Sequence, residues 1–357
     1  MGERILITGG AGFVGSHLAL KLKEQRSDCQ VIAFDNLKRR GSELNLPRLK
    51  AQGVDFVHGD IRQPADLESV GAFDVLLECS AEPSVLAGIN SSPRYVLDTN
   101  LAGTLNCLET ARVHKAGVIF LSTSRVYPID SLNKLDFDEA ETRFCLTDNQ
   151  TIDGSSSAGI QENFPLEGAR SLYGATKLSS ELIIQEYQSI YGMPTIINRC
   201  GVLTGPWQMG KVDQGVVVLW AARHIFQEPL SYIGYGGTGK QVRDILHVDD
   251  LAKLVSIQLD QMTALTGSTF NVGGGVEISA SLMELTDVCK SLTGNSIPID
   301  SITQNREADV RMYITDNARI TESLGWSPEI GVEQIMEDVV RWIRDNQDSL
   351  RPILSSS

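Results

Sequence analysis

The stretch that decides the fold runs from residue 4 to residue 15 and reads Arg4-Ile5-Leu6-Ile7-Thr8-Gly9-Gly10-Ala11-Gly12-Phe13-Val14-Gly15. Its first half is a short apolar run, which is typical of a buried β-strand. Its second half carries glycines at positions 9, 12 and 15, and a helical pattern follows. Glycines placed in this way allow a tight turn and let a pyrophosphate approach the N-terminus of the helix. The stretch therefore predicts a strand, a turn and a helix that bind a dinucleotide.

A second signal lies about twenty residues farther along, where such folds often carry an acidic residue. There the apolar run 30–34 ends at Asp35. A carboxylate in this place accepts hydrogen bonds from the ribose hydroxyls of NAD and repels the extra phosphate of NADP. A glycine-rich turn alone is a weak signal. The strand before it, the helix after it and Asp35 together predict that NAD is the cofactor.

Short β-branched runs alternate with longer helical patterns through roughly the first two hundred residues, as in α/β folds. This alternation predicts a Rossmann-type, doubly wound parallel sheet with helices on both faces. The expected strands are residues 4–8, 30–34, 54–58, 75–79, 118–122 and 195–198. Two amphipathic helices are expected at residues 95–115 and 172–191.

The length of 357 residues favours two lobes, because a single hydrophobic core usually stops growing below this size. We expect residues 1–197 to form the NAD-binding domain, with an insertion at 130–170 and with later segments such as 248–272 returning to it. Residues 198–346 are expected to form mainly a smaller C-terminal α/β lobe that binds substrate. Residues 347–357 show no periodicity and are expected to be a flexible tail.

Composition excludes several classes of partner. The formal net charge of −14 repels nucleic acid and anionic membrane surfaces, so local basic groups or backbone amides must hold any phosphate-bearing ligand. No apolar run approaches the roughly 18 residues that a membrane-spanning helix needs. The six cysteines are scattered, with no C-x-x-C pair and no histidine at metal-ligand spacing. We therefore expect reduced thiols, no metal site and a cytoplasmic enzyme.

Further motifs follow the glycine turn in order. Gly59-Asp60-Ile61 follows the third expected strand, Asn100 lies in the helix after the fourth, and Ser122-Thr123-Ser124-Arg125-Val126-Tyr127 follows the fifth. Tyr173-Gly174-Ala175-Thr176-Lys177 completes the set. With the G-x-x-G-x-x-G spacing, these motifs resemble the extended short-chain dehydrogenases/reductases that act on sugar nucleotides. The resemblance covers nearly the whole chain.

Tyr173 and Lys177 stand four residues apart on one expected helix, so their side chains project from the same face. A tyrosine with its ordinary pKa near 10 is a poor base at neutral pH. The lysine charge, together with an oxidised nicotinamide, would lower that pKa. The phenolate could then take a proton from a sugar hydroxyl while hydride leaves for the nicotinamide. The resemblance adds Thr123, whose hydroxyl would bond to the same reacting group, as the third catalytic residue.

The resemblance also implies two sets of binding residues. Those for NAD are Gly9, Gly12, Phe13, Val14, Gly15, Asp35, Asn36, Asp60, Ile61, Ser80, Ala81, Asn100, Tyr173 and Lys177. Those for a nucleotide-diphosphate sugar are Glu82, Ser124, Arg125, Asn198, Lys211, Gln214, Arg243 and Arg306, of which the last two are assigned to the diphosphate. For Asn100, bonding at a helix kink is an equally good interpretation. In relatives the helices 95–115 and 172–191 pair as a four-helix bundle, so a homodimer is expected.

Ser124 and Arg125 separate two activities. Sugar-nucleotide 4,6-dehydratases resemble this chain but carry Asp-Glu directly after the catalytic threonine, and these two residues supply the acid and base for elimination. Serine and arginine cannot do that work at neutral pH. The stretches 138–143, 208–215 and 236–247 instead look like those of the CDP-paratose 2-epimerases, also called CDP-tyvelose epimerases. That resemblance implies hydride transfer from carbon 2 to NAD, rotation of a 2-keto sugar, and hydride return to its opposite face.

The chain departs from this pattern at Pro128, where a glycine usually follows Val-Tyr, and at Glu82, where many relatives have glutamine. Two alternatives therefore stay open. One is a 4-epimerase of a UDP-sugar, which would use the same catalytic groups on a different carbon. The other is a non-catalytic, NAD-binding regulatory protein on the same fold. An intact set of Thr123, Tyr173 and Lys177 disfavours the second alternative.

Overall fold

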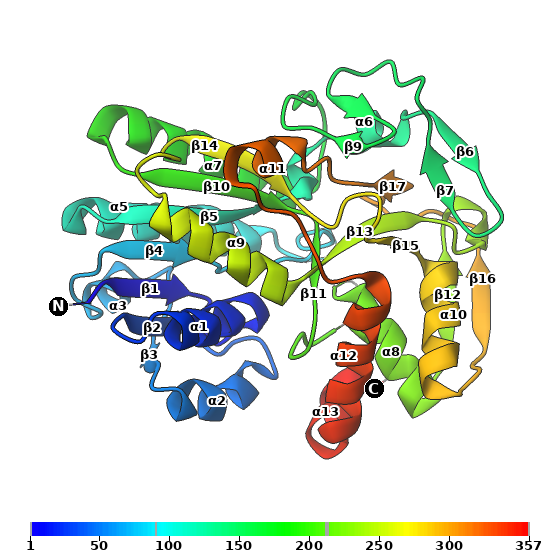
Figure 1. Cartoon of the computed structure of the whole chain (residues 1–357), viewed down its shortest axis with the longest axis horizontal. Coiled ribbons are helices and arrows are strands. Elements are labelled where there is room, and N and C mark those ends of the chain that lie inside the picture. Colours follow the sequence, from blue (N-terminus) through cyan, green and yellow to red (C-terminus); the bar gives the residue numbers. More distant parts are fainter. Residues whose placement is uncertain (1, 90, 211–213, 356–357) are drawn as a thin grey trace. The chain divides into compact units, whose positions relative to one another are not determined.

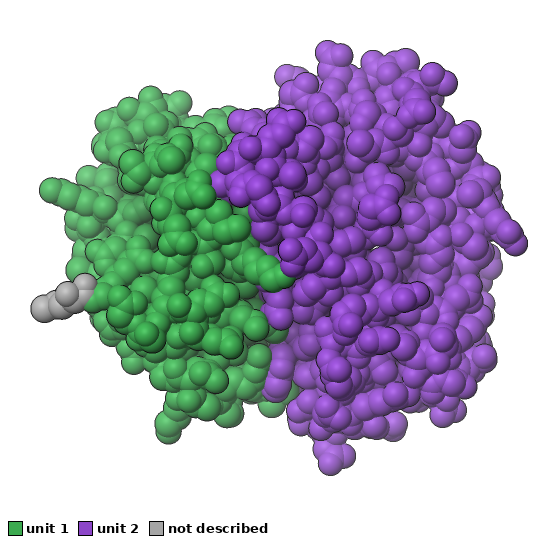
Figure 2. Space-filling view, viewed as in Figure 1, with its two compact units in different colours: residues 1–126, 171–199, 251–270 green, residues 127–170, 200–250, 271–357 purple. Residues whose placement is uncertain are grey.

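The chain folds into two compact units, each assembled from segments that lie far apart in the sequence (Figure 2). The computed structural model describes residues 2–89, 91–210 and 214–355. Unit 1 is built from residues 1–126, 171–199 and 251–270, and unit 2 from residues 127–170, 200–250 and 271–357. The segment expected as an insertion of the NAD-binding domain therefore clusters with unit 2, whereas 251–270 returns to unit 1.

A seven-stranded sheet, whose strands lie in the order β14, β10, β5, β4, β1, β2, β3, organises unit 1 (Figure 1). The strands are β1 (Arg4–Thr8), β2 (Gln30–Asp35), β3 (Asp55–His58), β4 (Val75–Glu78), β5 (Gly117–Thr123), β10 (Thr195–Cys200) and β14 (Ser268–Val272). The pairs β3–β2, β2–β1, β1–β4 and β4–β5 are parallel. This order confirms the Rossmann-type fold, and it reverses between β1 and β4, where doubly wound sheets bind ligands.

Helices pack against the sheet of unit 1 and bury its apolar side chains. They are α1 (Phe13–Gln25), α2 (Leu46–Ala51), α3 (Pro64–Glu68), α4 (Arg94–Leu97), α5 (Gly103–His114), α7 (Leu172–Tyr191) and α9 (Val248–Asp260). Ile5, Leu6 and Ile7 of β1 are all fully buried. Continuous burial along a strand is expected when helices cover both faces of a parallel sheet, because neither set of side chains then meets water.

The helix expected at residues 95–115 is not uniform. A π-helical turn, Asp98–Ala102, separates α4 from α5, and the backbone N–H of Gly103 donates to the carbonyl of Asp98, five residues earlier. Turns of this kind are rare and often occur at functional sites. The apolar spacing used for the prediction did not locate this turn, because the turn adds one residue to the helix without ending it.

Unit 2 contains a mixed sheet and a helical layer. Its strands and helices are α6 (Ile129–Asn133), β6 (Phe137–Glu139), β7 (Phe144–Leu146), β8 (Ser155–Ser156), β9 (Gly159–Ile160), β11 (Val202–Thr204), α8 (Val216–Phe226), β12 (Leu230–Ile233), β13 (Val242–His247), β15 (Ser279–Ser281), α10 (Leu282–Thr293), β16 (Ile299–Ile302), β17 (Met312–Tyr313), α11 (Ala318–Leu324) and α12 (Val332–Asp345). Strand β13 pairs with β11, β15 and β17. Helices α8, α10 and α12 pack on one another. In α12, Ile335, Val339 and Ile343 are buried at four-residue spacing, which gives the helix its core face.

The C-terminal segment differs from the expected flexible tail. Residues Gln347–Leu354 form helix α13, in which Leu350 and Leu354 are buried. These two leucines stand one helical turn apart, so a single short apolar stripe is enough to dock the segment. Two apolar residues are too few for periodicity to show in the sequence.

Candidate active site

The glycine turn after β1 leaves no room for side chains. Gly9 has φ of +64°, and a Cβ atom there would lie 2.9 Å from the carbonyl oxygen of Cys79. A Cβ atom on Gly15 would lie 2.2 Å from the carbonyl oxygen of Gly9. Gly12 precedes α1 without a capping side chain, and the first amides of a helix have no partner within it. The turn is therefore built to present backbone N–H groups to an anion.

Acidic residues at the ends of β2 and β3 come next to this turn. Asp35 accepts hydrogen bonds from the backbone N–H of Leu37 at 2.7 Å and of Ala11 at 3.1 Å, and burial raises the pKa of its carboxyl. The side-chain amide of Asn36 donates to Asp60 at 3.0 Å. The Arg62 guanidinium beside Asp60 lowers the pKa of that carboxyl. The structure thus brings Asp35, Asn36 and Asp60 to one edge of the sheet.

Asn100 clamps the loop that follows β4. Its Oδ1 accepts the backbone N–H of Glu82 at 2.8 Å, and its Nδ2 donates to the Glu82 carbonyl at 3.0 Å. The carbonyl of Asn100, in the π-helical turn, accepts hydroxyl hydrogen bonds from Ser180 and Thr104. Asn100 therefore fixes the loop that carries Ser80, Ala81 and Glu82, and it also joins that loop to α7.

The three expected catalytic residues all lie in unit 1. Thr123 ends β5, is 7% exposed, and its Oγ1 accepts the backbone N–H of Arg125 at 3.2 Å. Tyr173 and Lys177 lie on α7, which packs against β5 and the turn Ser124–Val126. Ser171 caps this helix by accepting the N–H of Gly174 at 3.2 Å. Tyr173 and Lys177 are both buried, at 9% and 2% exposed. A buried tyrosine and lysine on one helix face are suited to proton transfer.

Two buried carboxylates stand close to these groups, and the sequence reasoning missed both. Glu78 lies 3.7 Å from the Nζ of Lys177. Glu181, one turn beyond Lys177 on α7, accepts hydrogen bonds from Ser122 and from Arg199, whose Nη2 is 2.8 Å away. A signal for Glu78 was present, because a lone glutamate ends the apolar run 75–77 of a central strand. For Glu181, the signal was its spacing of four from Lys177.

The expected substrate residues are divided between the units. Glu82, Ser124 and Arg125 lie in unit 1 on the loops described above. Asn198 is also in unit 1 but is not brought to them. It is fully buried in β10, and its side-chain amide exchanges two hydrogen bonds of 2.8 Å with that of Gln258.

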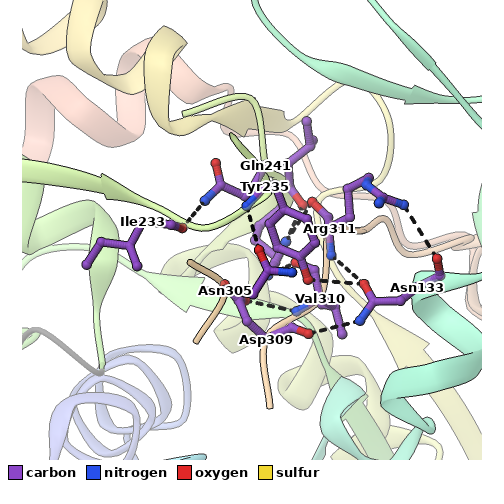
Figure 3. Close-up of polar contacts among 10 residues, drawn as sticks. Asn133, Ile233, Tyr235, Gln241, Asn305, Asp309, Val310 and Arg311 are labelled. Carbon is purple, nitrogen blue, oxygen red and sulfur yellow. Dashed lines mark hydrogen bonds and ion pairs between the residues drawn. The ribbon is translucent and has the colours of Figure 1, made fainter. Parts of the chain in front are cut away.

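In unit 2, Arg243 of β13 contacts the loop that carries Arg306. The guanidinium of Arg243 donates to the carboxylate of Asp309 at 3.0 Å and to the carbonyl of Val310 at 2.6 Å. Arg306 lies in this loop, in which Asn133 contacts Asp309 and Arg311, and Asn305 accepts the backbone N–H of Tyr235 (Figure 3). Gln214 precedes α8, whereas Lys211 lies outside the described residues.

The placement of the histidine, cysteine and acidic side chains bears on metal and disulfide sites. Among the residues that the structure describes, no group of three histidine, cysteine or acidic side chains is placed to hold a metal ion. All six cysteines are free thiols. Within residues 2–89, 91–210 and 214–355, no helix has the length and apolar character needed to cross a bilayer.

Residues 5–273 match the model of a protein family described as "NAD dependent epimerase/dehydratase family". The chain is 31% identical over 355 residues to CDP-paratose 2-epimerase of Salmonella typhi, covering 95% of this chain and 98% of that protein. It is also 31% identical over 350 residues to a putative UDP-glucose 4-epimerase of Methanocaldococcus jannaschii, covering 96% and 99%. A solved structure, the UDP-glucose 4-epimerase of Thermotoga maritima with UDP-glucose, superposes with a TM-score of 0.78 at 26% identity, covering 96% of this chain and 99% of that one.

Proposed function

The chain belongs to the NAD dependent epimerase/dehydratase family, and from this premise we propose that it inverts one carbon of a nucleotide-diphosphate sugar, as a CDP-paratose 2-epimerase does. The observation that carries the proposal is the buried pair of Tyr173 and Lys177 on α7, packed against the strand that ends at Thr123. A binding protein would have no use for a buried base and its charged partner.

The residues present fit NAD. Cβ atoms on Gly9 and Gly15 would collide with backbone, so these glycines let the turn pack tightly, and the uncapped N-terminus of α1 after Gly12 offers its amides to a pyrophosphate. We assign the cofactor to this turn with Phe13 and Val14, to Asp35, Asn36, Asp60 and Ile61 at the ends of β2 and β3, to Ser80, Ala81 and Asn100 around the loop after β4, and to Tyr173 and Lys177. Bound NAD would supply an acceptor, and later a donor, of hydride.

Side chains of the protein would supply the proton transfer. The Lys177 ammonium favours the phenolate of Tyr173, which takes the proton of the sugar hydroxyl. The hydroxyl of Thr123 bonds to the same oxygen and orients it. Once the keto sugar has turned its other face, the same phenol returns the proton. No net oxidation results, so each turnover leaves the cofactor as it began.

The family name covers dehydratases as well as epimerases. The residues that follow Thr123 favour epimerisation over dehydration. Elimination of water needs an acid and a base beside the sugar. Ser124 and Arg125 occupy the two positions after Thr123, and neither exchanges protons at neutral pH. Besides hydride exchange with NAD, epimerisation requires only the proton transfer assigned to Thr123, Tyr173 and Lys177.

A UDP-sugar 4-epimerase is the second candidate. It is favoured by the relative from Methanocaldococcus jannaschii, which matches the chain at the same 31% identity as the CDP-paratose 2-epimerase. Both reactions use the same catalytic groups, and only the orientation of the sugar differs. We assign the sugar nucleotide to Glu82, Ser124 and Arg125 in unit 1, and to Lys211, Gln214, Arg243 and Arg306 in unit 2.

A substrate panel separates these candidates. The purified protein is incubated with CDP-, UDP- and GDP-linked sugars, and the products are read by NMR, with Tyr173→Phe as the matched inactive control. A new epimer at carbon 2 of a CDP-sugar supports the first candidate, and inversion at carbon 4 of a UDP-sugar supports the second. A 4-keto-6-deoxy product would contradict both, because it requires elimination.

We also propose that the protein is a homodimer in a reducing, cytoplasmic setting. Helices α5 and α7 carry large apolar side chains in water, with Val113 66%, Leu182 56% and Ile190 65% exposed. A second copy of the same patch would bury them. Sedimentation should give a dimer at micromolar concentration, and Leu182→Glu with Ile190→Glu should give a monomer. The free thiols suit the cytoplasm.

A further inference from the structure

Glu78 occupies an unusual place for a carboxylate. It ends the central strand β4 and lies opposite Thr8 of β1, where the strand order reverses. Its side chain is only 1% exposed. One carboxylate oxygen, Oε1, accepts the backbone N–H of Ser80 at 3.0 Å and the hydroxyl of Thr8 at 3.5 Å.

The other oxygen is directed at the catalytic lysine. Oε2 accepts no hydrogen bond from the described residues and lies 3.7 Å from Nζ of Lys177. The same Nζ stands 4.2 Å from the ring centroid of Phe120. Lys177 is 2% exposed, so little water screens the two charges. An isolated ammonium would be costly in such a place, and Glu78 supplies the countercharge.

Other groups around the pair do not take over this role. From α5, the Cys107 thiol faces it, but burial raises the pKa of that thiol well above its ordinary value, so it stays neutral. From α7, Glu181 lies one turn beyond Lys177 and is occupied by Arg199 of β10. Burial raises the pKa of the Glu78 carboxyl, and the Lys177 ammonium acts in the opposite direction.

We propose that Glu78 is a positioning residue for Lys177: its carboxylate holds the ammonium in place and weakens the positive field that the ammonium exerts on Tyr173. The inference rests on the proposed function in taking Tyr173 as the base. Lysine and the oxidised nicotinamide both favour the phenolate. A phenolate favoured too strongly is a weak base, so a partial countercharge keeps it effective.

The sign of the effect follows from the sign of the charge. The Glu78 carboxylate opposes the formation of another negative charge on Tyr173, and it offsets the ammonium that favours the phenolate. While Lys177 keeps its proton, removing the carboxylate therefore lowers the pH at which the phenolate forms.

The test is a tyrosinate titration of Glu78→Gln, a change that keeps shape and removes charge. Ultraviolet absorbance is followed against pH in protein that retains its NAD, and the same titration in a Tyr173→Phe background is subtracted. The midpoint assigned to Tyr173 should fall by about one pH unit, because the field of the Lys177 ammonium on the phenol is then no longer offset. Glu68→Gln, which removes an exposed carboxylate from α3 of the same unit, should leave the midpoint unchanged.

An unchanged midpoint in folded Glu78→Gln overturns the inference, because Glu78 would then be neutral or purely structural. Should that variant fail to fold, Glu78→Asp, which withdraws the charge by one methylene, must lower the midpoint by a smaller amount, and no decrease overturns the inference. The titration needs no sugar, so its failure is separate from failure of the substrate panel. In an active variant, the acid limb of the kcat/KM profile should move to lower pH as well.

Discussion

The two units hold their charged side chains in different ways. In unit 1, Glu181 and Arg199 face each other at 1% and 6% exposed, between a helix and the sheet it covers. In unit 2, Arg143 and Glu284 are about one quarter exposed, and they join the hairpin of β6 and β7 to the start of α10. Water screens the second pair but not the first. The comparison teaches that unit 1 buries charged side chains away from water, the proposed catalytic Lys177 among them, whereas the pair of Arg143 and Glu284 in unit 2 fastens a hairpin near the surface.

The strongest test of the first half of this comparison is Tyr173→Phe. It should reduce turnover by roughly two to four decades, about 3 to 5 kcal/mol, because only the proton-transferring hydroxyl is lost. NAD content after purification should stay near that of the wild type. Lys177→Ala should lose rate and cofactor together. Wild-type turnover in Tyr173→Phe, followed by NMR, would refute the assigned base.

Breaking the buried pair of unit 1 should come next in size. Arg199→Met leaves the Glu181 carboxylate buried without its partner, and unfolding free energy should fall by about 3 to 5 kcal/mol. Urea denaturation measures the loss. The double variant Glu181→Leu with Arg199→Met should recover most of it, because no unpaired charge then remains. A single variant as stable as the wild type would show that water reaches this pair.

Asp244 offers a way to break the comparison, because it is a buried carboxylate in unit 2. It is fully buried on β13, and burial raises the pKa of its carboxyl from 3.8 to about 6. The folded state therefore binds this proton more tightly than the unfolded chain does. Stability from this group is full below pH 3.8 and is lost as pH rises through 6.

Asp244→Asn removes that dependence. Between acid and neutral pH, the wild type should lose about 3 kcal/mol of unfolding free energy relative to the variant. Denaturation at several pH values measures it. A constant difference across this range would show that Asp244 does not titrate there.

The smallest effect on the free energy of unfolding is expected for the ion pair of Arg143 and Glu284 in unit 2. Arg143→Ala removes a guanidinium that donates to Glu284 and to the carbonyl of Ser279, and about 1 to 3 kcal/mol should be lost. Arg341→Ala, whose pair with Asp338 is exposed on the arginine side, is the matched control and should change stability by less than about 0.5 kcal/mol. Equal losses would abolish the distinction between the two pairs.

Sequence reasoning reached unit 1 more easily than unit 2, for a physical reason. The glycine turn and the spacing of Tyr173 and Lys177 are local features. The regular repeat of a strand or a helix therefore predicts where these residues lie, without knowledge of the tertiary structure. The contacts of unit 2 join distant segments, as when Asn133 bonds Arg311 or Thr142 bonds Glu284. No periodicity relates such pairs. Helix α13 was missed because packing on unit 2, rather than its own pattern, stabilises it.

The π-helical turn at Asp98–Ala102 makes the chain sensitive to length at this point. An α-helix advances by about 100° per residue, so deleting one residue there would restore a regular helix and rotate everything before it by that angle relative to α5. The amide of Asn100 would then point away from Glu82. The extra residue thus sets the rotation of α4 relative to α5. A deletion at this point would disturb the loop after β4, which carries Ser80, Ala81 and Glu82, more than many substitutions within it.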